Sequence, residues 1–157
     1  YTPSVFAKLP RLMERAGMSS TGSITAFYTV LVDGDDFNEP IADAVRGILD
    51  GHIVLSRRIA AQNHYPAIDV LNSVSRLMSG IASPEQKTAA NQMRNMLALI
   101  QKNEDLLAIG AYQPGSNPNL DKAVSHRKKM DEFLIQDTDR SYPFEETVRL
   151  LQQAVEE

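Results

Sequence analysis

A ten-residue apolar run near the start of the chain constrains the fold most strongly. Residues 23–32, SITAFYTVLV, are mostly β-branched, aromatic or small and carry no charge. Such side chains favour extended strands. A strand without polar alternation is typical of a parallel sheet whose two faces are both covered. The run therefore predicts a strand buried on both faces, inside a layered α/β domain.

The flanking segments alternate between helical and extended patterns. Helices are favoured where apolar residues recur at spacings of three and four, and proline suits the first helical position. A residue before proline favours extended chain. The pattern predicts, in order, a short helix over 10–16, a helix from Pro40, a strand over 52–56, a short helix over 57–62 and extended chain over 65–71. Together these elements suggest the edge of an α/β sheet.

The pattern becomes helical after Gly80. Ser83, Pro84 and Gln86 make a strong helix start, with a capping hydroxyl, a proline at the first position and a capping-box glutamine. The apolar face of this helix is expected to run to about residue 108. Further helices are predicted to begin at Asn117-Pro118 and within SYPFEET, residues 141–147. We therefore divide the chain into an α/β piece, 1–80, and a helical bundle, 81–157.

Composition excludes several function classes. The 157 residues are 43% apolar and 23% charged, which is ordinary for a soluble globular domain. A net charge of −4 argues against a nucleic-acid binder that depends on a basic field. The absence of cysteine excludes disulfides and thiolate metal sites. No apolar run approaches the roughly 20 residues that span a bilayer. The first residue is Tyr1 rather than methionine, which suggests a processed protein or a fragment.

No complete catalytic set is visible in the residues. The phosphate-cradling pattern G-x-x-x-x-G-K-[ST] is absent, and the three histidines have no ligand spacing. The acidic stretch 33–40 lacks the glycine spacing of a calcium loop, so a solvated turn is favoured. The basic run 126–129 fits a solvated helix face or a weak electrostatic partner site. Arg76, after the extended YPAIDVL stretch, fits either a solvated charge or a phosphate-binding group. Taken alone, these residues leave both open.

Several segments, in order, match one known family. They are YTPSVFAKLPRLMERAG, GSITAFYTVLVDGDDFNEPIAD, GHIVLSRRIA, HYPAID, SVSRLM and IGAYQPGSNPNLDKA. Because they keep the family's order and spacing, the chain resembles the C-terminal portion of rotary-type ATPases, in particular the flagellar type III protein-export ATPases. The resemblance covers residues 1 to about 135 well and the last 20 loosely.

This resemblance implies a fold and a limit. The fold is α/β: the C-terminal part of a RecA-like nucleotide-binding domain, residues 1–80, followed by a small α-helical bundle, residues 81–157. In such enzymes the phosphate loop, the catalytic glutamate and the magnesium ligands lie upstream of the segment matching Tyr1. ATP and magnesium are therefore expected in the full-length ring. The isolated chain is expected to bind neither and to be inactive.

The resemblance also implies roles for particular residues. Arg76, in SVSR, lies where the family has its arginine finger, which reaches a neighbouring subunit's ATP. The acidic loop that faces the central stalk matches Asp35, Asp36, Phe37, Asn38 and Glu39. Thr88 falls near the position of an aromatic residue that contacts adenine in the ATP synthase catalytic subunit. No residue is expected to bind a metal.

Partners and location follow from the same resemblance. The implied assembly is a homohexamer in the cytoplasm, at the base of the export apparatus. The implied partners are a central-stalk coiled coil, export chaperones and the export gate, with membrane association only through partners. Two alternatives stay open: a non-catalytic interaction module, and a non-catalytic rotary ATPase subunit. The motifs favour flagellar over virulence secretion without deciding between them.

Overall fold

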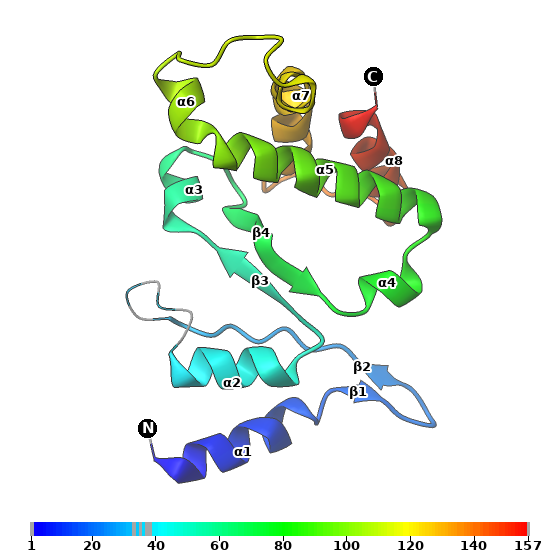
Figure 1. The fold of residues 1–157 in the computed structure, drawn as a ribbon. Helices are drawn as coiled ribbons and strands as arrows, with labels where there is room; N and C mark the ends of the chain where they lie inside the picture. Colours follow the sequence, from blue (N-terminus) through cyan, green and yellow to red (C-terminus); the bar gives the residue numbers. More distant parts are fainter. Residues whose placement is uncertain (1, 33, 35, 37–38, 157) are drawn as a thin grey trace. The chain divides into compact units, whose positions relative to one another are not determined.

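The structure is a computed structural model that describes residues 2–32, 34, 36 and 39–156 (Figure 1). The chain forms two compact units, residues 1–52 and 53–157, which we describe separately. The sequence pattern places its division after residue 80 instead. Compactness and sequence pattern are different criteria. The domain boundary after residue 80 therefore stays a prediction. Among the described residues, no helix has both the length and the apolar character needed to cross a membrane.

The first unit pairs two helices with a short hairpin. Its elements are α1 (Pro3–Met13), β1 (Gly17–Met18), β2 (Ser23–Ile24) and α2 (Pro40–Ile48). The strands are antiparallel, with Gly17 opposite Ile24. α1 packs on α2, and the buried side chains are Met13 from α1 and Ala42 and Val45 from α2.

The prediction of a long buried strand over 23–32 is wrong. β2 ends at Ile24, and residues 25–32 form no strand. Phe27 is 90% exposed and Leu31 89%. A strand needs neighbours that accept and donate its backbone hydrogen bonds, and no strand among the described residues pairs with 25–32. The parallel sheet that the apolar run predicts is therefore not formed by these residues.

The predicted helix over 10–16 is also wrong in its bounds. α1 begins at Pro3, and Pro10 lies inside it. Val5, Phe6, Leu9 and Met13 continue one partly or fully buried helical face across the proline. Pro10 cannot donate a backbone hydrogen bond, but its carbonyl accepts one from the Glu14 N–H at 2.8 Å. The packing of this face therefore stabilises the helix enough for it to continue through Pro10.

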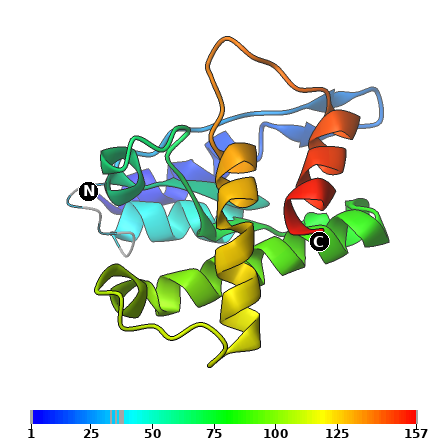
Figure 2. The ribbon, with the colours of Figure 1, turned by 90° about the horizontal axis from the view of Figure 1, so that it is seen from above.

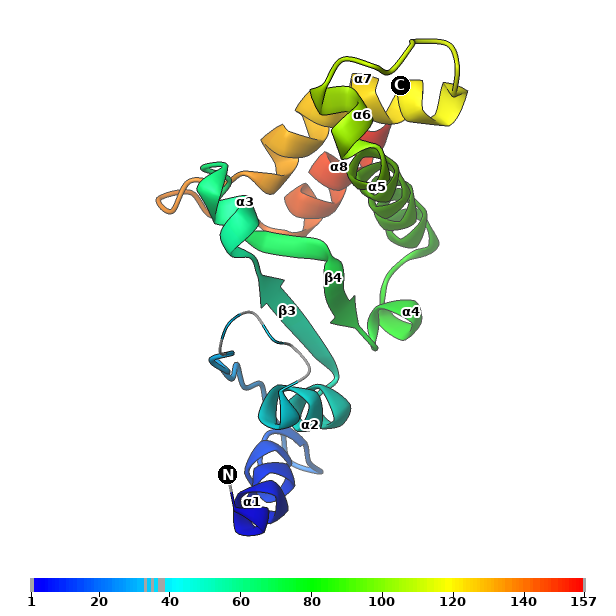
Figure 3. The ribbon, with the colours of Figure 1, turned by 60° about the vertical axis from the view of Figure 1, so that its left-hand side comes forward.

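The second unit packs a two-stranded sheet against a helical bundle. Its elements are β3 (Gly51–Leu55, which begins within the first unit), α3 (Arg57–Ala61), β4 (Ile68–Ser75), α4 (Met78–Ile81), α5 (Pro84–Lys102), α6 (Glu104–Ala108), α7 (Pro118–Leu134) and α8 (Phe144–Val155). β3 pairs with β4, and their arrows run in opposite directions (Figures 1 and 3). The predicted strand over 52–56 and helix over 57–62 are confirmed within one residue.

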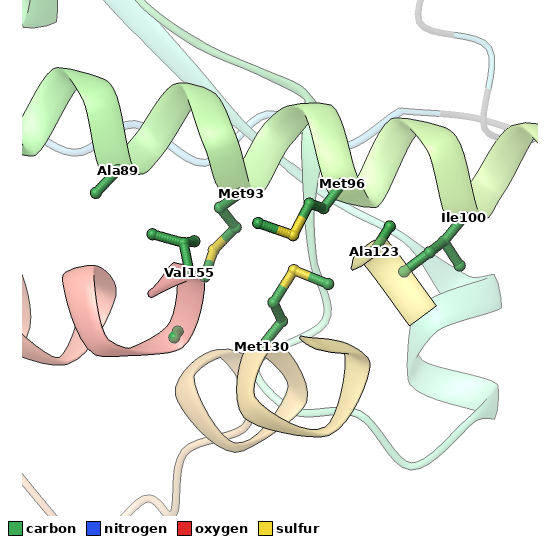
Figure 4. Close-up of a cluster of buried hydrophobic side chains, with 8 residues drawn as sticks. Ala89, Met93, Met96, Ile100, Ala123, Met130 and Val155 are labelled. Carbon is green, nitrogen blue, oxygen red and sulfur yellow. The ribbon is translucent and has the colours of Figure 1, made fainter. Parts of the chain in front are cut away.

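Helix α5 is central to this unit. It contacts α7, α8 and β4, and α7 also contacts α8 (Figure 2). One face of α5 packs on the two later helices (Figure 4). The buried cluster comprises Ala89, Met93, Met96, Ile100, Ala123, Met130, Ala154 and Val155. The predicted helical bundle is therefore confirmed, with methionines as a large part of its core.

The sequence signals at the helix starts hold in the structure. The Ser83 Oγ accepts a hydrogen bond from the Gln86 N–H at 3.2 Å. The Asn117 Oδ1 accepts from the Asn119 N–H at 3.1 Å. The predicted end near residue 108 holds only in part, because α5 stops at Lys102 and α6 follows. Asn103 interrupts the helix, and its side-chain amide donates to the Leu99 carbonyl at 2.8 Å.

The Ser83 cap provides a first testable prediction. Replacing Ser83 by alanine removes the cap and should lower the free energy of unfolding by about 1 kcal/mol. The pKa of Glu85 is lowered by a hydrogen bond from the backbone N–H of Glu85 and by another from the Ser83 side chain. A carboxyl with a lowered pKa stabilises the fold above its ordinary pKa and loses that effect as the pH falls. The variant should therefore raise the pKa of Glu85, which an NMR titration measures.

Ser125→Ala is the matched control for this substitution. The Ser125 hydroxyl donates to the Lys122 carbonyl at 2.8 Å from an exposed site inside α7. It caps no helix, so we expect a change in unfolding free energy within about 0.5 kcal/mol. Equal losses in the two variants would contradict a capping role for Ser83.

Candidate functional site

Arg76 lies at the end of a strand, on the surface. It follows β4 directly and precedes α4, and it is exposed together with Ser75 and Leu77. A guanidinium has five N–H donors in a planar fork that matches phosphate oxygens. The structure thus places the predicted residue where a group from another molecule can reach it.

The strand leading to Arg76 is held by an aspartate. The Asp69 Oδ1 accepts hydrogen bonds from the Leu71 N–H at 3.1 Å and from the Asn72 N–H at 3.0 Å. The Asp69 Oδ2 accepts from the Asn72 side-chain amide at 2.9 Å. This Asx-type turn satisfies backbone donors that a neighbouring strand would otherwise bind. It therefore fixes the backbone four to seven residues before Arg76.

Ser73 connects the same segment to the neighbouring strand. Its hydroxyl donates to the Asp69 carbonyl at 2.6 Å. The same oxygen accepts from the Val54 N–H of β3 at 3.0 Å. One hydroxyl thus joins β3 and β4, three residues before Arg76.

Two hollows lie beside this strand, between it and the helices. One has a volume of about 190 Å³ and is lined by His64, Pro66, Ile68, Val70, Phe133, Leu134 and Gln136. The other, of about 110 Å³, is lined by residues of α3, β4, α5, α6 and α7, with the Arg58–Glu104 ion pair at its edge. The loop after α7 reaches the first hollow, because the Gln136 N–H donates to the Tyr65 carbonyl at 2.9 Å.

The other predicted site residues are not tested by the structure. Asp35, Phe37 and Asn38 lie outside the described residues. Thr88 lies in the first turns of α5, where its hydroxyl donates to the Pro84 carbonyl at 2.9 Å. Both the stalk-facing loop, with Asp36 and Glu39, and the adenine contact of Thr88 stay predictions.

The basic run 126–129 is engaged within the bundle. His126 is buried, and its Nε2 lies 3.2 Å from the Glu156 carbonyl. The Lys129 Nζ donates to the same carbonyl at 2.9 Å. Arg127 pairs with Asp131 on the next turn. The Lys129 ammonium at the C-terminus of α8 complements the dipole of that helix, so part of the basic run contributes to the fold.

The described residues offer few groups for a magnesium ion or a nucleotide phosphate. Among them, no three His, Cys, Asp or Glu side chains are grouped so as to hold a metal ion. The sequence also has no lysine-bearing phosphate loop. Arg76 is the predicted site residue whose chemistry fits a phosphate, and a guanidinium alone does not coordinate magnesium.

Family comparisons divide the chain much as its motifs do. Residues 1–75 match the ATP synthase alpha/beta family, nucleotide-binding domain. Residues 82–153 match the type III secretion EscN ATPase C-terminal domain. The chain belongs to the flagellar and type III secretion ATPases. Both the predicted family and the predicted α/β fold with a helical bundle are confirmed.

One curated relative of this ATPase family is the flagellum-specific ATP synthase of Treponema pallidum. The two sequences are 56% identical over 151 residues. The match covers 96% of this chain and 34% of the relative. The chain therefore spans about a third of the length of that relative.

Solved structures of the family agree with the fold. The assembled ATPase EscN from the enteropathogenic E. coli type III secretion system matches with a TM-score of 0.96 and 45% identity. The match covers 99% of this chain and 38% of EscN. EscN in complex with its central stalk EscO matches with a TM-score of 0.89 and 44% identity, over 99% of this chain and 37% of EscN.

No motif in the sequence indicates the groups that hold the strand before Arg76. These are Asp69, Ser73 and, from α5, Arg94, which donates hydrogen bonds to carbonyls of β4. An aspartate inside a strand-forming stretch was a usable signal, because aspartate favours turns over strands. For Arg94 no local signal exists, since its partners are backbone carbonyls more than 20 residues earlier.

Proposed function

We propose that this chain is the C-terminal part of a ring-forming ATPase that energises flagellar type III protein export. The observation that carries the proposal is an exposed arginine at the end of β4, in a chain 56% identical to a flagellum-specific ATP synthase. In the complete polypeptide, residues 1–80 would complete a RecA-like domain and residues 81–157 would form the helical domain.

Arg76 is proposed as an arginine finger. Charge develops on the equatorial oxygens of the phosphoryl group as it is transferred. A preorganised guanidinium stabilises that charge more in the transition state than in the ground state, and so accelerates hydrolysis. By the family resemblance, the ATP that Arg76 serves would be one bound mainly by a neighbouring subunit. This arrangement makes each site depend on two subunits of a homohexamer.

ATP and magnesium belong to the complete ring in this proposal. The phosphate loop and the magnesium ligands would come from the part of the polypeptide that precedes the matched segment. This chain's own contribution would be Arg76 toward the phosphates and, by sequence position, Thr88 toward the adenine end. The metal would supply charge neutralisation at the transferred phosphate.

The proposed partners follow from charge and from the relative EscN. The stretch Asp35–Glu39 is acidic, which suits a basic coiled coil. EscN has been solved with its central stalk EscO, so a stalk in the ring of this ATPase is the corresponding partner. Export chaperones and the export gate would bind the assembled ring, in the cytoplasm at the base of the export apparatus.

A mixed-ring experiment tests whether Arg76 acts on a neighbour. One full-length subunit carries Arg76→Ala; the other keeps Arg76 but has a disabled phosphate loop. Each alone should form a nearly inactive ring. Together they should regain ATPase activity, because an intact phosphate loop can then meet an intact Arg76 across a subunit boundary.

As a control, each variant is mixed separately with wild-type subunits. This mixture measures whether subunits exchange between rings, independently of whether the two variants complement each other. Exchange without regained activity would contradict action in trans. Full activity of the Arg76→Ala ring alone would instead favour a chain that only binds partners, without a part in hydrolysis.

A further inference from the structure

A second arginine, Arg94, contacts the backbone of the strand that leads to Arg76. Arg94 is half-buried on α5. Its Nη1 donates to the Val70 carbonyl and lies 3.4 Å from the Ser73 carbonyl. Its Nη2 donates to the Leu71 carbonyl at 3.2 Å. A single guanidinium thus reaches three carbonyls of β4.

These contacts complement those made by Asp69. Asp69 accepts hydrogen bonds from the N–H groups of Leu71 and Asn72, whereas Arg94 donates to carbonyls of the same segment. A half-buried carbonyl without a donor costs free energy, and hydrogen bonds from a charged donor are stronger than neutral ones. The backbone over residues 69–73 is therefore held through both its donors and its acceptors.

The helix that carries Arg94 is itself firmly anchored. Met93 and Met96, on either side of Arg94 in sequence, are buried against α7 and α8 (Figure 4). Arg94 points instead to β4, which α5 also contacts. Because one face of α5 is packed in the bundle, the arginine on its other face has little freedom to shift.

The geometry points to Arg94 as a positioning residue for Arg76. Arg76 follows Ser73 by three residues, about 10 Å of extended chain. Fixing the carbonyls of residues 70–73 therefore limits where the exposed guanidinium of Arg76 can lie relative to α5. Arg94 couples the finger to the helical bundle without touching the nucleotide. This inference rests on the finger role proposed for Arg76.

The test is steady-state ATP hydrolysis by the full-length ring. Arg94→Met should lower kcat by about tenfold and leave KM nearly unchanged, because a misplaced finger weakens only transition-state interactions. Arg94→Lys, which keeps a charged donor, should recover most of the loss. Arg149→Met is the matched control: Arg149 on α8 lies 3.7 Å from Glu146 in an exposed ion pair, and its loss should leave kcat unchanged.

A double-mutant cycle with Arg76→Ala separates positioning from general damage. If Arg94 acts through Arg76, adding Arg94→Met to Arg76→Ala should cause no further loss of kcat. A further tenfold loss in that background would overturn the positioning role, as would an unchanged kcat in Arg94→Met alone. The proposed finger role fails separately, if Arg76→Ala alone keeps full turnover. Where Arg94→Met rings do not assemble, Arg94→Gln, which keeps a neutral donor, carries the same cycle and the same outcomes.

Discussion

Arg76→Ala should lower the ATPase turnover of the full-length ring by at least about 10²-fold. That factor corresponds to about 2.7 kcal/mol of lost transition-state stabilisation. A guanidinium on a developing phosphoryl charge contributes this much where water is excluded and the group is preorganised. The chain stability should change little, because Arg76 is exposed on a surface segment between β4 and α4. Turnover at saturating ATP and thermal unfolding, measured on the same preparations, check both expectations.

Two further variants define what this result means. Arg76→Lys keeps the charge but not the planar fork, and we expect most of the loss to persist. Arg149→Ala removes another exposed arginine, one paired with Glu146, and should leave turnover unchanged. Unchanged turnover in Arg76→Ala would remove the finger assignment. A melting temperature that falls together with turnover would attribute the loss to folding instead.

Local signals predicted the helical half of the fold well. Ser83 and Asn117 combine a capping side chain with a following proline, and both caps form as expected. These signals depend only on neighbouring residues, which the sequence displays directly. The run 23–32 depended instead on strands elsewhere in a sheet. Among the described residues, β2 ends at Ile24 and no other strand pairs with the rest of the run. The strand-forming side chains of residues 25–32 therefore did not produce a strand.

The proposed site was predictable only where a motif indicated it. The role proposed for Arg76 rests on the ordered resemblance, since an arginine after a strand has no distinctive local pattern. Its supports were not identified, because Arg94 binds backbone carbonyls, which every residue has and no sequence pattern distinguishes. Asp69 and Ser73 lie closer in sequence, yet their hydrogen bonds depend on the local backbone geometry that they help to fix. Hydrogen bonds of this kind become visible only in the folded structure.

The bundle that anchors Arg94 depends on Met130, whose removal should have the largest effect on stability. Met130 is 0% exposed and belongs to the buried cluster shared by α5, α7 and α8 (Figure 4). Met130→Ala removes several heavy atoms where three helices meet, and the helices cannot all close the gap. Loss of a fully buried methionine costs about 2–5 kcal/mol, from lost burial and from the remaining cavity.

Urea unfolding of the 157-residue chain, followed by helical circular dichroism, measures this loss. Met18→Ala is the matched control, because Met18 is 86% exposed and the same substitution there should cost less than about 0.5 kcal/mol. Met130→Leu keeps most of the volume and should cost less than about 1.5 kcal/mol. If Met130→Ala and Met18→Ala unfold at the same urea concentration, the three helices do not pack around Met130. A large loss in Met130→Ala with a small one in Met130→Leu would assign the effect to the cavity, since both variants lose the thioether sulfur.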